Sequence, residues 1–454
     1  MNIKGLKRCL KLFTLANISI WFSCQASAQN MQEAVRIALA QYPAILAAQS
    51  RIEAADSDII RAQGAHWPQV AWMGTYSVYN SSRVQDTWIQ SPTVNMNIWS
   101  GWRIQSDVDR SKSLADASRQ QQRITRDDIA LQTIEGYLNW AHQIELVILA
   151  KENLLNHQKI FNDISQIVDI DPGRGIDRNQ AVVRLENAKV ILQQREGDLS
   201  TATERLNRML LGKMPATPSD IDFAPGVTPE SLQEALAYVN ELHPIIAQLR
   251  AQIYAAQASV KNARAQYSPT VNMTFGKQTY QGSGQGDYVT QLILNVPIFD
   301  GGTAYGATGV AQGNLNALER ILQESELVLR ERIATFWSDW GSAKGRKSLG
   351  QSQSVTAQAL LVGYRLQFQV GRRSSLDLLN VQSDLFTYQS NAENASYEAR
   401  LARARIMASI GKLATAYIGA ATNSDQSSFY SIPQKIEVVS TQPSNQKIQL
   451  DLGN

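Results

Sequence analysis

The chain has 454 residues, of which 44% are hydrophobic and 18% are charged, and its formal net charge is +3. The apolar content is ordinary and the charged fraction lies below the usual ~25%, which excludes a disordered chain and a nucleic-acid partner. Two cysteines are too few for a disulfide scaffold.

Residues 1–28 are predicted to be a secretory signal peptide. Met1–Lys11 is basic, Leu12–Phe22 is mostly apolar, and Ala26-Ser27-Ala28 gives the small-residue pattern of a cleavage site. Cys9 and Cys24 both fall inside this segment, so the mature chain is expected to contain no cysteine. Lipidation of Cys24 is the alternative, although the bulky residues before it fit that poorly. No later apolar run reaches the roughly 18 residues of a transmembrane helix.

The rest of the sequence indicates an internal duplication. Four unrelated segments recur at one offset near 200 residues, namely Tyr42-Pro43 as His243-Pro244, Asn97–Gly101 as Pro297–Gly301, Tyr137 and Trp140 as Trp337 and Trp340, and Ile176-Asp177 as Leu376-Asp377. Agreement on one offset predicts two structural repeats. We expect them over residues 29–225 and 226–420, followed by a polar tail over 421–454.

Each repeat is predicted to contribute two strands, at about 68–79 and 91–99 and again at about 269–276 and 288–299. Apolar residues alternate there with Asn, Thr and Gln, as in half-buried strands. An antiparallel sheet packed on helices would explain this pattern. A sheet in a membrane would also explain it, but about eight strands are needed to close a barrel. Several chains would then have to pool their strands, because open edges cannot face lipid.

Long helices are predicted after each strand pair, because proline breaks helices and none lies between Pro92 and Pro172 or between Pro297 and Pro433. We expect helices at about 101–168 and 176–211, and at about 302–370 and 375–412. Leucines at 185, 192, 199 and 206 form a heptad that favours coiled-coil packing. Residues 101–168 would span about 100 Å, so these helices project well beyond a compact domain.

Two segments carry a resemblance to a known family. Val296–Gly302 stands where a strand enters a long helix, and Phe368–Gln382 covers the second helix junction. With the duplicated element order over roughly 30–415, they resemble the TolC family of bacterial outer-membrane channels. Phe368–Gln382, and Asp171–Gly175 followed by Asp177 and Gln180, look most like members that serve type I secretion, including exporters of large adhesins.

The resemblance implies an α + β membrane protein of the Gram-negative outer membrane, extending into the periplasm. Three chains would form a homotrimer whose twelve strands make one β-barrel, continued by an α-helical tunnel. The implied partners are a periplasmic membrane-fusion adaptor, indirectly an inner-membrane ABC transporter, outer-membrane lipid and a secreted protein cargo. The alternatives are the outer-membrane duct of a multidrug efflux pump and, more remotely, a periplasmic coiled-coil structural protein without a pore.

The resemblance also implies a periplasmic gate at the two helix junctions. An acidic residue in the position of Asp377 lines the constriction in the family, and an Arg in the position of Arg373 helps to hold it shut. Asp177, the repeat counterpart of Asp377, is the expected partner of Arg373. Asn380 stands where some relatives have a second Asp, and Phe368 where some have Tyr. Alternatively, Asp177 and Asp377 only cap helices.

The resemblance further implies that the junctions, which are small, flexible and basic, are adaptor-docking tips. The residues concerned are Gly173, Arg174, Gly175, Val370, Gly371, Arg372 and Ser374. The alternative is that they are merely turn residues. The four histidines show no metal-binding spacing, and no constellation suits catalysis. We therefore expect no metal, no cofactor and no enzymatic activity.

Overall fold

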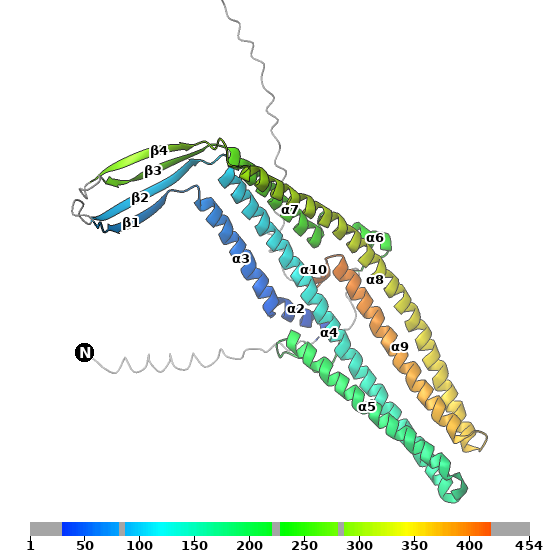
Figure 1. The fold of residues 1–454 in the computed structure, drawn as a ribbon. Coiled ribbons are helices and arrows are strands. Elements are labelled where there is room, and N and C mark those ends of the chain that lie inside the picture. Colours follow the sequence, from blue (N-terminus) through cyan, green and yellow to red (C-terminus); the bar gives the residue numbers. More distant parts are fainter. Residues whose placement is uncertain (1–29, 81–86, 220–227, 280–285, 419–454) are drawn as a thin grey trace, which may run out of the picture.

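The computed structural model describes residues 30–80, 87–219, 228–279 and 286–418 (Figure 1). The predicted signal peptide with both cysteines and the predicted polar tail lie outside the described residues. Within the described ranges, no helix combines the length and the apolar character needed to cross a membrane.

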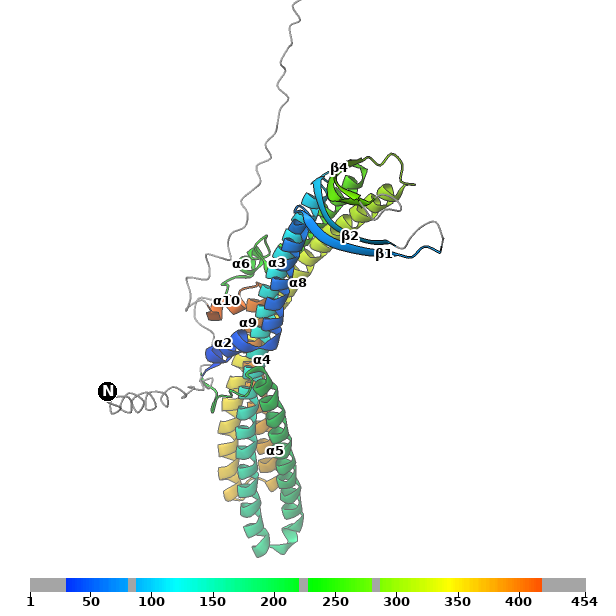
Figure 2. The ribbon, with the colours of Figure 1, turned by 90° about the vertical axis from the view of Figure 1, so that its left-hand side faces the viewer.

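A curved antiparallel sheet forms one end of the elongated molecule (Figures 1 and 2). Its strands, in spatial order, are β1 (Gln69–Ser77), β2 (Thr87–Trp99), β3 (Thr270–Thr279) and β4 (Gly286–Asn295). The two repeats meet in the middle of the sheet, where Val94 of β2 pairs with Phe275 of β3. The fourth strand stops at Asn295, short of the expected 299. Pro297 has no N–H to donate to a ladder, so the chain leaves the sheet there.

No described helix packs over either face of this sheet. The two faces differ in chemistry, yet both carry exposed side chains in the single chain, as Val70 and Gln69 do. The interpretation of the alternating pattern as a sheet packed on its own helices is therefore wrong. The sheet projects from the helices and must find its partners elsewhere.

Two helical hairpins run from the sheet to the opposite end of the molecule (Figure 1). In the first repeat, α2 (Met31–Gln41) and α3 (Pro43–Gly64) precede β1, while α4 (Arg103–Ile170), the 3-10 turn η1 (Pro172–Arg174) and α5 (Gly175–Met209) follow β2. In the second repeat, α6 (Leu232–Ala237), α7 (Pro244–Arg264) and η2 (Ala265–Tyr267) precede β3, while α8 (Thr303–Gln369), α9 (Ser375–Ser409) and α10 (Leu413–Ile418) follow β4. With 68 and 67 residues, α4 and α8 are each about 100 Å long.

The passage from strand to long helix is built alike in both repeats. Gly101 adopts a φ of +61°, and a Cβ atom there would lie 2.1 Å from the Cβ of Ser268, so only glycine fits. The carboxylate of Asp300 accepts hydrogen bonds from the backbone N–H groups of Gly302 and Ala304, at 2.9 and 2.7 Å. Ser100 does the same for Ile104, at 3.2 Å. These side chains satisfy free N–H groups where the helices begin.

The main hydrophobic core lies around the middle of the long helices, where the short helices α2, α6 and α10 flank them (Figure 2). Both repeats contribute to it, for example through Tyr137 and Leu206 from the first and Ile333 and Leu413 from the second. The repeats are therefore interlocked in one unit, although the chain order separates them.

The equivalent long helices occupy different environments. Helix α4 packs against α3, α5, α7 and α9, whereas α8 packs mainly against α7 and α9. Tyr137 and Trp140 of α4 form an edge-on pair with ring centroids 5.7 Å apart, and both are buried. Their counterparts Trp337 and Trp340 keep the same arrangement, at 5.2 Å, but stay half-exposed. Of the two equivalent helices, α4 is thus surrounded by other helices of the chain, whereas α8 lies at its edge.

Candidate functional site

The two helix junctions lie together at the end of the molecule farthest from the sheet (Figure 1). At the first tip, α4 ends at Ile170 and α5 begins at Gly175 after the short turn η1, where the Asp171 side chain accepts a 3.2 Å hydrogen bond from the N–H of Gly173. At the second tip, Gly371 takes a φ of +71°, which glycine adopts without strain. Each tip is therefore a compact turn at the far end of a very long helix.

Neither Asp177 nor Asp377 is the N-cap residue of its helix. The cap of α9 is Ser374, whose hydroxyl accepts a 3.2 Å hydrogen bond from the backbone N–H of Asp377. Helix α5 has Arg174 at its cap position, without a side-chain cap bond. Asp177 and Asp377 lie in the first turns instead, where the helix dipole favours negative charge. Their carboxylates are therefore available for other partners.

Each of these carboxylates meets an arginine of its own tip. Asp177 accepts from the Arg174 guanidinium at 3.0 and 2.9 Å, whereas Asp377 lies 3.9 Å from Nη1 of Arg373. Within a single described chain the expected pair of Arg373 and Asp177 is not formed. Arg174 takes the place beside Asp177 because it lies three residues before it on the same helical face.

Arg373 is held by two further groups of α8. Its Nε donates a 3.0 Å hydrogen bond to Oε1 of Gln367, and its guanidinium lies 4.4 Å from the ring centroid of Tyr364. A cation over an aromatic face at an exposed site contributes about 0.5–1 kcal/mol. Arg373 therefore bridges the end of α8 to the start of α9 and fixes the second tip.

Asn380 joins the two hairpins. Its Oδ1 accepts a 3.1 Å hydrogen bond from Nη2 of Arg184 on α5. A second polar link between the hairpins runs from Arg365 on α8 to Asp163 on α4, at 3.4 Å. The sequence arguments missed both links. The spacing gave a signal for Arg184, which follows Asp177 by seven residues and so shares its helix face.

A small hydrophobic core lies directly behind the tips. It is formed by all four long helices, through Ile160, Ile164 and Val168 of α4, Ala181 of α5, Phe368 of α8 and Leu378 and Leu379 of α9. Phe368 is 5% exposed, so its ring packs inside this core. An aromatic residue without a hydroxyl group suits this place because a buried hydroxyl would need a partner.

Between the tip core and the main core, buried polar side chains lie at the interface of α4 and α9. The Nε2 of Gln382 donates a 3.1 Å hydrogen bond to Oδ1 of Asn153 across the α4–α9 interface. One turn further along α4, His157 is 3% exposed. Burial, and to a lesser degree the charge of Arg184, lowers the pKa of His157 to about 4. The ring is therefore neutral at ordinary pH.

The expected docking residues are exposed or half-exposed at the very end of the molecule. Val370 is 69% exposed, and Gly173, Gly371 and Arg372 are exposed as well. Two of the seven have defined structural roles, since Arg174 pairs with Asp177 and Ser374 caps α9. In the described part of the chain, no group of three His, Cys, Asp or Glu residues could hold a metal ion.

Comparisons with known proteins agree with this architecture. A family model described as outer membrane efflux protein matches residues 34–212 and 235–412. Outer membrane efflux protein BepC of Brucella suis is 23% identical over 376 residues, covering 80% of this chain and 81% of BepC. Protein CyaE of Bordetella pertussis is 24% identical over 410 residues, covering 84% of each chain. A crystal structure of CusC superimposes with a TM-score of 0.74 at 18% identity, covering 84% of this chain and 92% of CusC.

Proposed function

Since the chain belongs to the outer membrane efflux protein family, we propose that it is the exit duct of a type I secretion system and carries a secreted protein such as an adhesin. It is a channel of the outer membrane that extends into the periplasm, and it is not an enzyme. Channels of this family form trimers and work with a periplasmic adaptor and an inner-membrane pump. The cargo and the gate are what the proposal adds.

The proposal of a gate is supported by the charged turn at the end of each long helix. Three chains with two tips each bring six tips around one axis. Asp377, half-exposed beside the 3.9 Å contact to Arg373, then contributes an acidic ring to the constriction. Asn380 adds no charge, because it is neutral and is bonded to Arg184. The duct opens like an iris when the adaptor competes for the contacts that hold the tips together.

Arg373 acts as the latch of this gate. It binds Gln367, Tyr364 and Asp377 of its own chain, so the second tip moves as one body. Asp177 is already neutralised by Arg174 within each chain. An arginine from a neighbouring chain must therefore compete with Arg174 for Asp177. A contact between chains at Asp177 is then easier to break than it would be if this aspartate were unpaired.

The sequence of the tips supports a protein cargo. Phe368–Gln382, with Asp171–Gly175, Asp177 and Gln180 in the first repeat, resembles the branch of the TolC family that serves type I secretion. Drug efflux is the second candidate, and the name of BepC as an efflux protein favours it. Deletion of the gene distinguishes them. Loss of a secreted surface protein supports our proposal, whereas antibiotic sensitivity with secretion intact supports efflux.

We also propose that the adaptor docks on the exposed tip residues Gly173, Arg174, Gly175, Val370, Gly371, Arg372 and Ser374. A single cysteine in place of Arg372 or Arg174 should form an adduct with the adaptor when a photo-reactive thiol reagent is attached. The same variants in a strain that lacks the adaptor are the control. A product of equal size and yield in both strains is not an adaptor adduct, and the absence of an adduct at both positions would count against docking at the tips.

A further inference from the structure

The two faces of the sheet present opposite chemistries to their surroundings. Cross-strand pairing places Val70, Val94 and Phe275 in one row and Met96, Met273 and Leu292 in the next. These side chains share one face, and Val70 and Leu292 are 76% and 70% exposed. Apolar side chains exposed to this degree over neighbouring strands fit a lipid environment.

The opposite face carries rows of amide and hydroxyl groups. Gln69 pairs with Asn95, Asn95 with Thr274, and Thr274 with Gln291, so one polar row crosses all four strands. In the next row Asn97 lies opposite Asn272, and its Nδ2 donates a 2.7 Å hydrogen bond to the Oδ1 of Asn272. Ile293 completes that second row.

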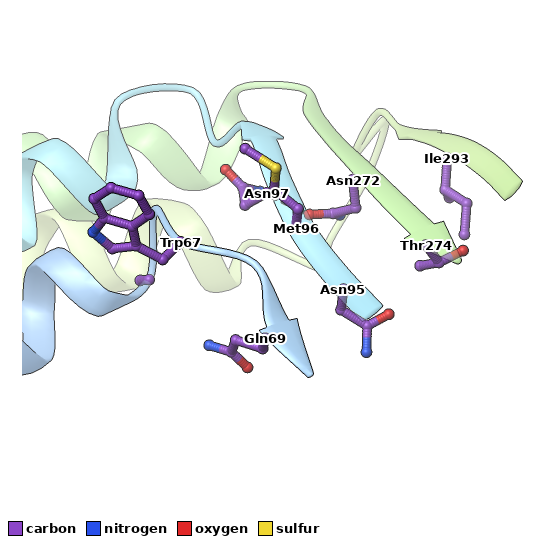
Figure 3. A pocket seen from close by; sticks show the side chains of 9 residues that line it. Trp67, Gln69, Asn95, Met96, Asn97, Asn272, Thr274 and Ile293 are labelled. Atoms are coloured by element: carbon purple, nitrogen blue, oxygen red, sulfur yellow. Dashed lines mark hydrogen bonds between the residues drawn. The ribbon is translucent and has the colours of Figure 1, made fainter. Parts of the chain in front are cut away.

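With the exception of Gln291, these groups line a hollow of about 370 Å³ beside the end of α3 (Figure 3). Both rows lie where the strands meet the helices, because β1 and β3 begin here and β2 and β4 end here. The hollow is therefore at the neck between sheet and helical hairpins. Around it, Figure 3 shows Gln69 of β1, Asn95 and Asn97 of β2, Asn272 and Thr274 of β3 and Ile293 of β4.

The neck carries no charged side chain on its strands. In the described strands, Lys277 and Asp287 are the charged residues, and both lie toward the far end of β3 and β4. The helical tips, in contrast, bring together Arg174, Asp177, Arg373 and Asp377. Charged side chains are thus gathered at the tips but are absent from the strands at the neck.

We propose that Gln69, Asn95, Asn97, Asn272, Thr274 and Gln291 form an uncharged amide collar that lines the passage where the sheet meets the helical tunnel. The inference rests on the proposed channel function. Lipid takes the apolar face, so the polar face borders water. Side-chain amides both donate and accept hydrogen bonds, and they attract neither sign of charge. The collar therefore passes acidic and basic segments of an unfolded polypeptide alike, and discrimination by charge rests with the tips.

Single cysteines test which face lines the passage, because the predicted mature chain contains no other cysteine. Asn97→Cys and Val94→Cys are a matched pair, since both residues lie in the regularly paired part of β2 and are three residues apart, so that they point to opposite faces. The trimer is reconstituted in planar bilayers, and a methanethiosulfonate bearing either a negative or a positive group is added. At position 97, the conductance should change in up to three steps, one for each chain. The negative reagent should shift selectivity toward cations and the positive reagent toward anions.

Val94→Cys, on the apolar face, should leave the conductance unchanged, and mass spectrometry reads the labelling at each position. Thr274→Cys is the second collar variant, because it is close in size to the original and leaves the Asn97–Asn272 bond intact. It should behave as Asn97→Cys does. A labelled collar position without change in conductance, or a change at position 94, overturns the collar. A protein that forms no channel before any reagent is added contradicts the proposed function itself.

Discussion

Asp127 of α4 accepts a 2.7 Å hydrogen bond from the backbone N–H of Ala414, which lies 287 residues later in the chain. The carboxylate is 8% exposed and holds the start of α10, which enters the main core through Leu413 and Tyr417. The first repeat thus fixes the end of the second. Burial raises the pKa of Asp127 to about 6, although the bond from Ala414 opposes the increase.

Replacing Asp127 by Asn should stabilise the protein at alkaline pH. A raised pKa in the folded state means that this group favours folding most below pH 3.8, and that the benefit is lost as the pH rises through about 6. Asn keeps an oxygen for the N–H of Ala414 but carries no charge. We expect a gain of up to about 3 kcal/mol at pH 8 and little gain at pH 4.

The measurement is thermal unfolding of the detergent-solubilised protein between pH 4 and pH 8. Asp116→Asn is the control, because Asp116 lies on the same helix but is exposed, with an ion pair to Arg119. A melting temperature of Asp127→Asn that lies below wild type at pH 8 would show that the charged carboxylate is needed.

The buried histidines should have the opposite effect on acid stability. Burial lowers the pKa of His142, His157 and His243. Because each remains neutral in the folded state, their contribution is present above about pH 6.5 and is lost as the pH falls toward the folded pKa. For His157 that window reaches down to about pH 4.

His157→Leu should therefore flatten the acid limb of the stability profile. The loss of stability between pH 7 and pH 4 should shrink by up to about 3 kcal/mol, as followed by circular dichroism. The control is His66→Gln, because His66 is exposed at the end of α3. Equal acid slopes for wild type and His157→Leu would refute the assignment.

Arg373→Ala should raise the conductance of the isolated channel in planar bilayers. The variant loses the contacts to Gln367, Tyr364 and Asp377, so the second tip is no longer fixed to α8. Arg372→Ala changes the neighbouring exposed residue and should leave the closed conductance near that of wild type. Unchanged conductance in Arg373→Ala would remove Arg373 from the latch.

Leu378→Ala should loosen the tips without unfolding the molecule. Leu378 is fully buried in the tip core, where truncation of a leucine costs about 2–5 kcal/mol. The main core lies far along the helices and is not touched. We expect faster proteolysis at residues 169–175 and 370–375, read by mass spectrometry. Leu376→Ala, at a half-exposed neighbour, is the control and should be cleaved at the wild-type rate.

The long helices and the strand positions were predictable because local chemistry determines them. Proline-free stretches and a heptad mark the helices, and alternation marks the strands. The pairing of Arg373 with Asp177 was expected from resemblance, whereas within one chain Arg174 occupies Asp177. Resemblance could not find this, because Arg174 lies three residues before Asp177 and reaches its carboxylate locally, whereas Arg373 contacts groups of its own tip.

The sequence did not predict which of two equivalent positions in the repeats is buried. Tyr137 and Trp337 are equivalent by offset, yet the first is buried and the second is half-exposed. Burial depends on how many helices surround a position, and a duplicated sequence gives the same pattern for both copies. Likewise, alternation in the strands identifies two faces but says nothing about whether helices cover one of them.

The position of α8 at the edge of the chain has a consequence for biogenesis. In the lone chain Leu327, Leu349 and Val355 are 70–74% exposed, and the sheet leaves its apolar face open as well. Such surfaces are aggregation-prone until copies meet. In a newly exported chain, assembly therefore competes with aggregation. The rate of synthesis must stay within the capacity of the cell to shield and insert the chain.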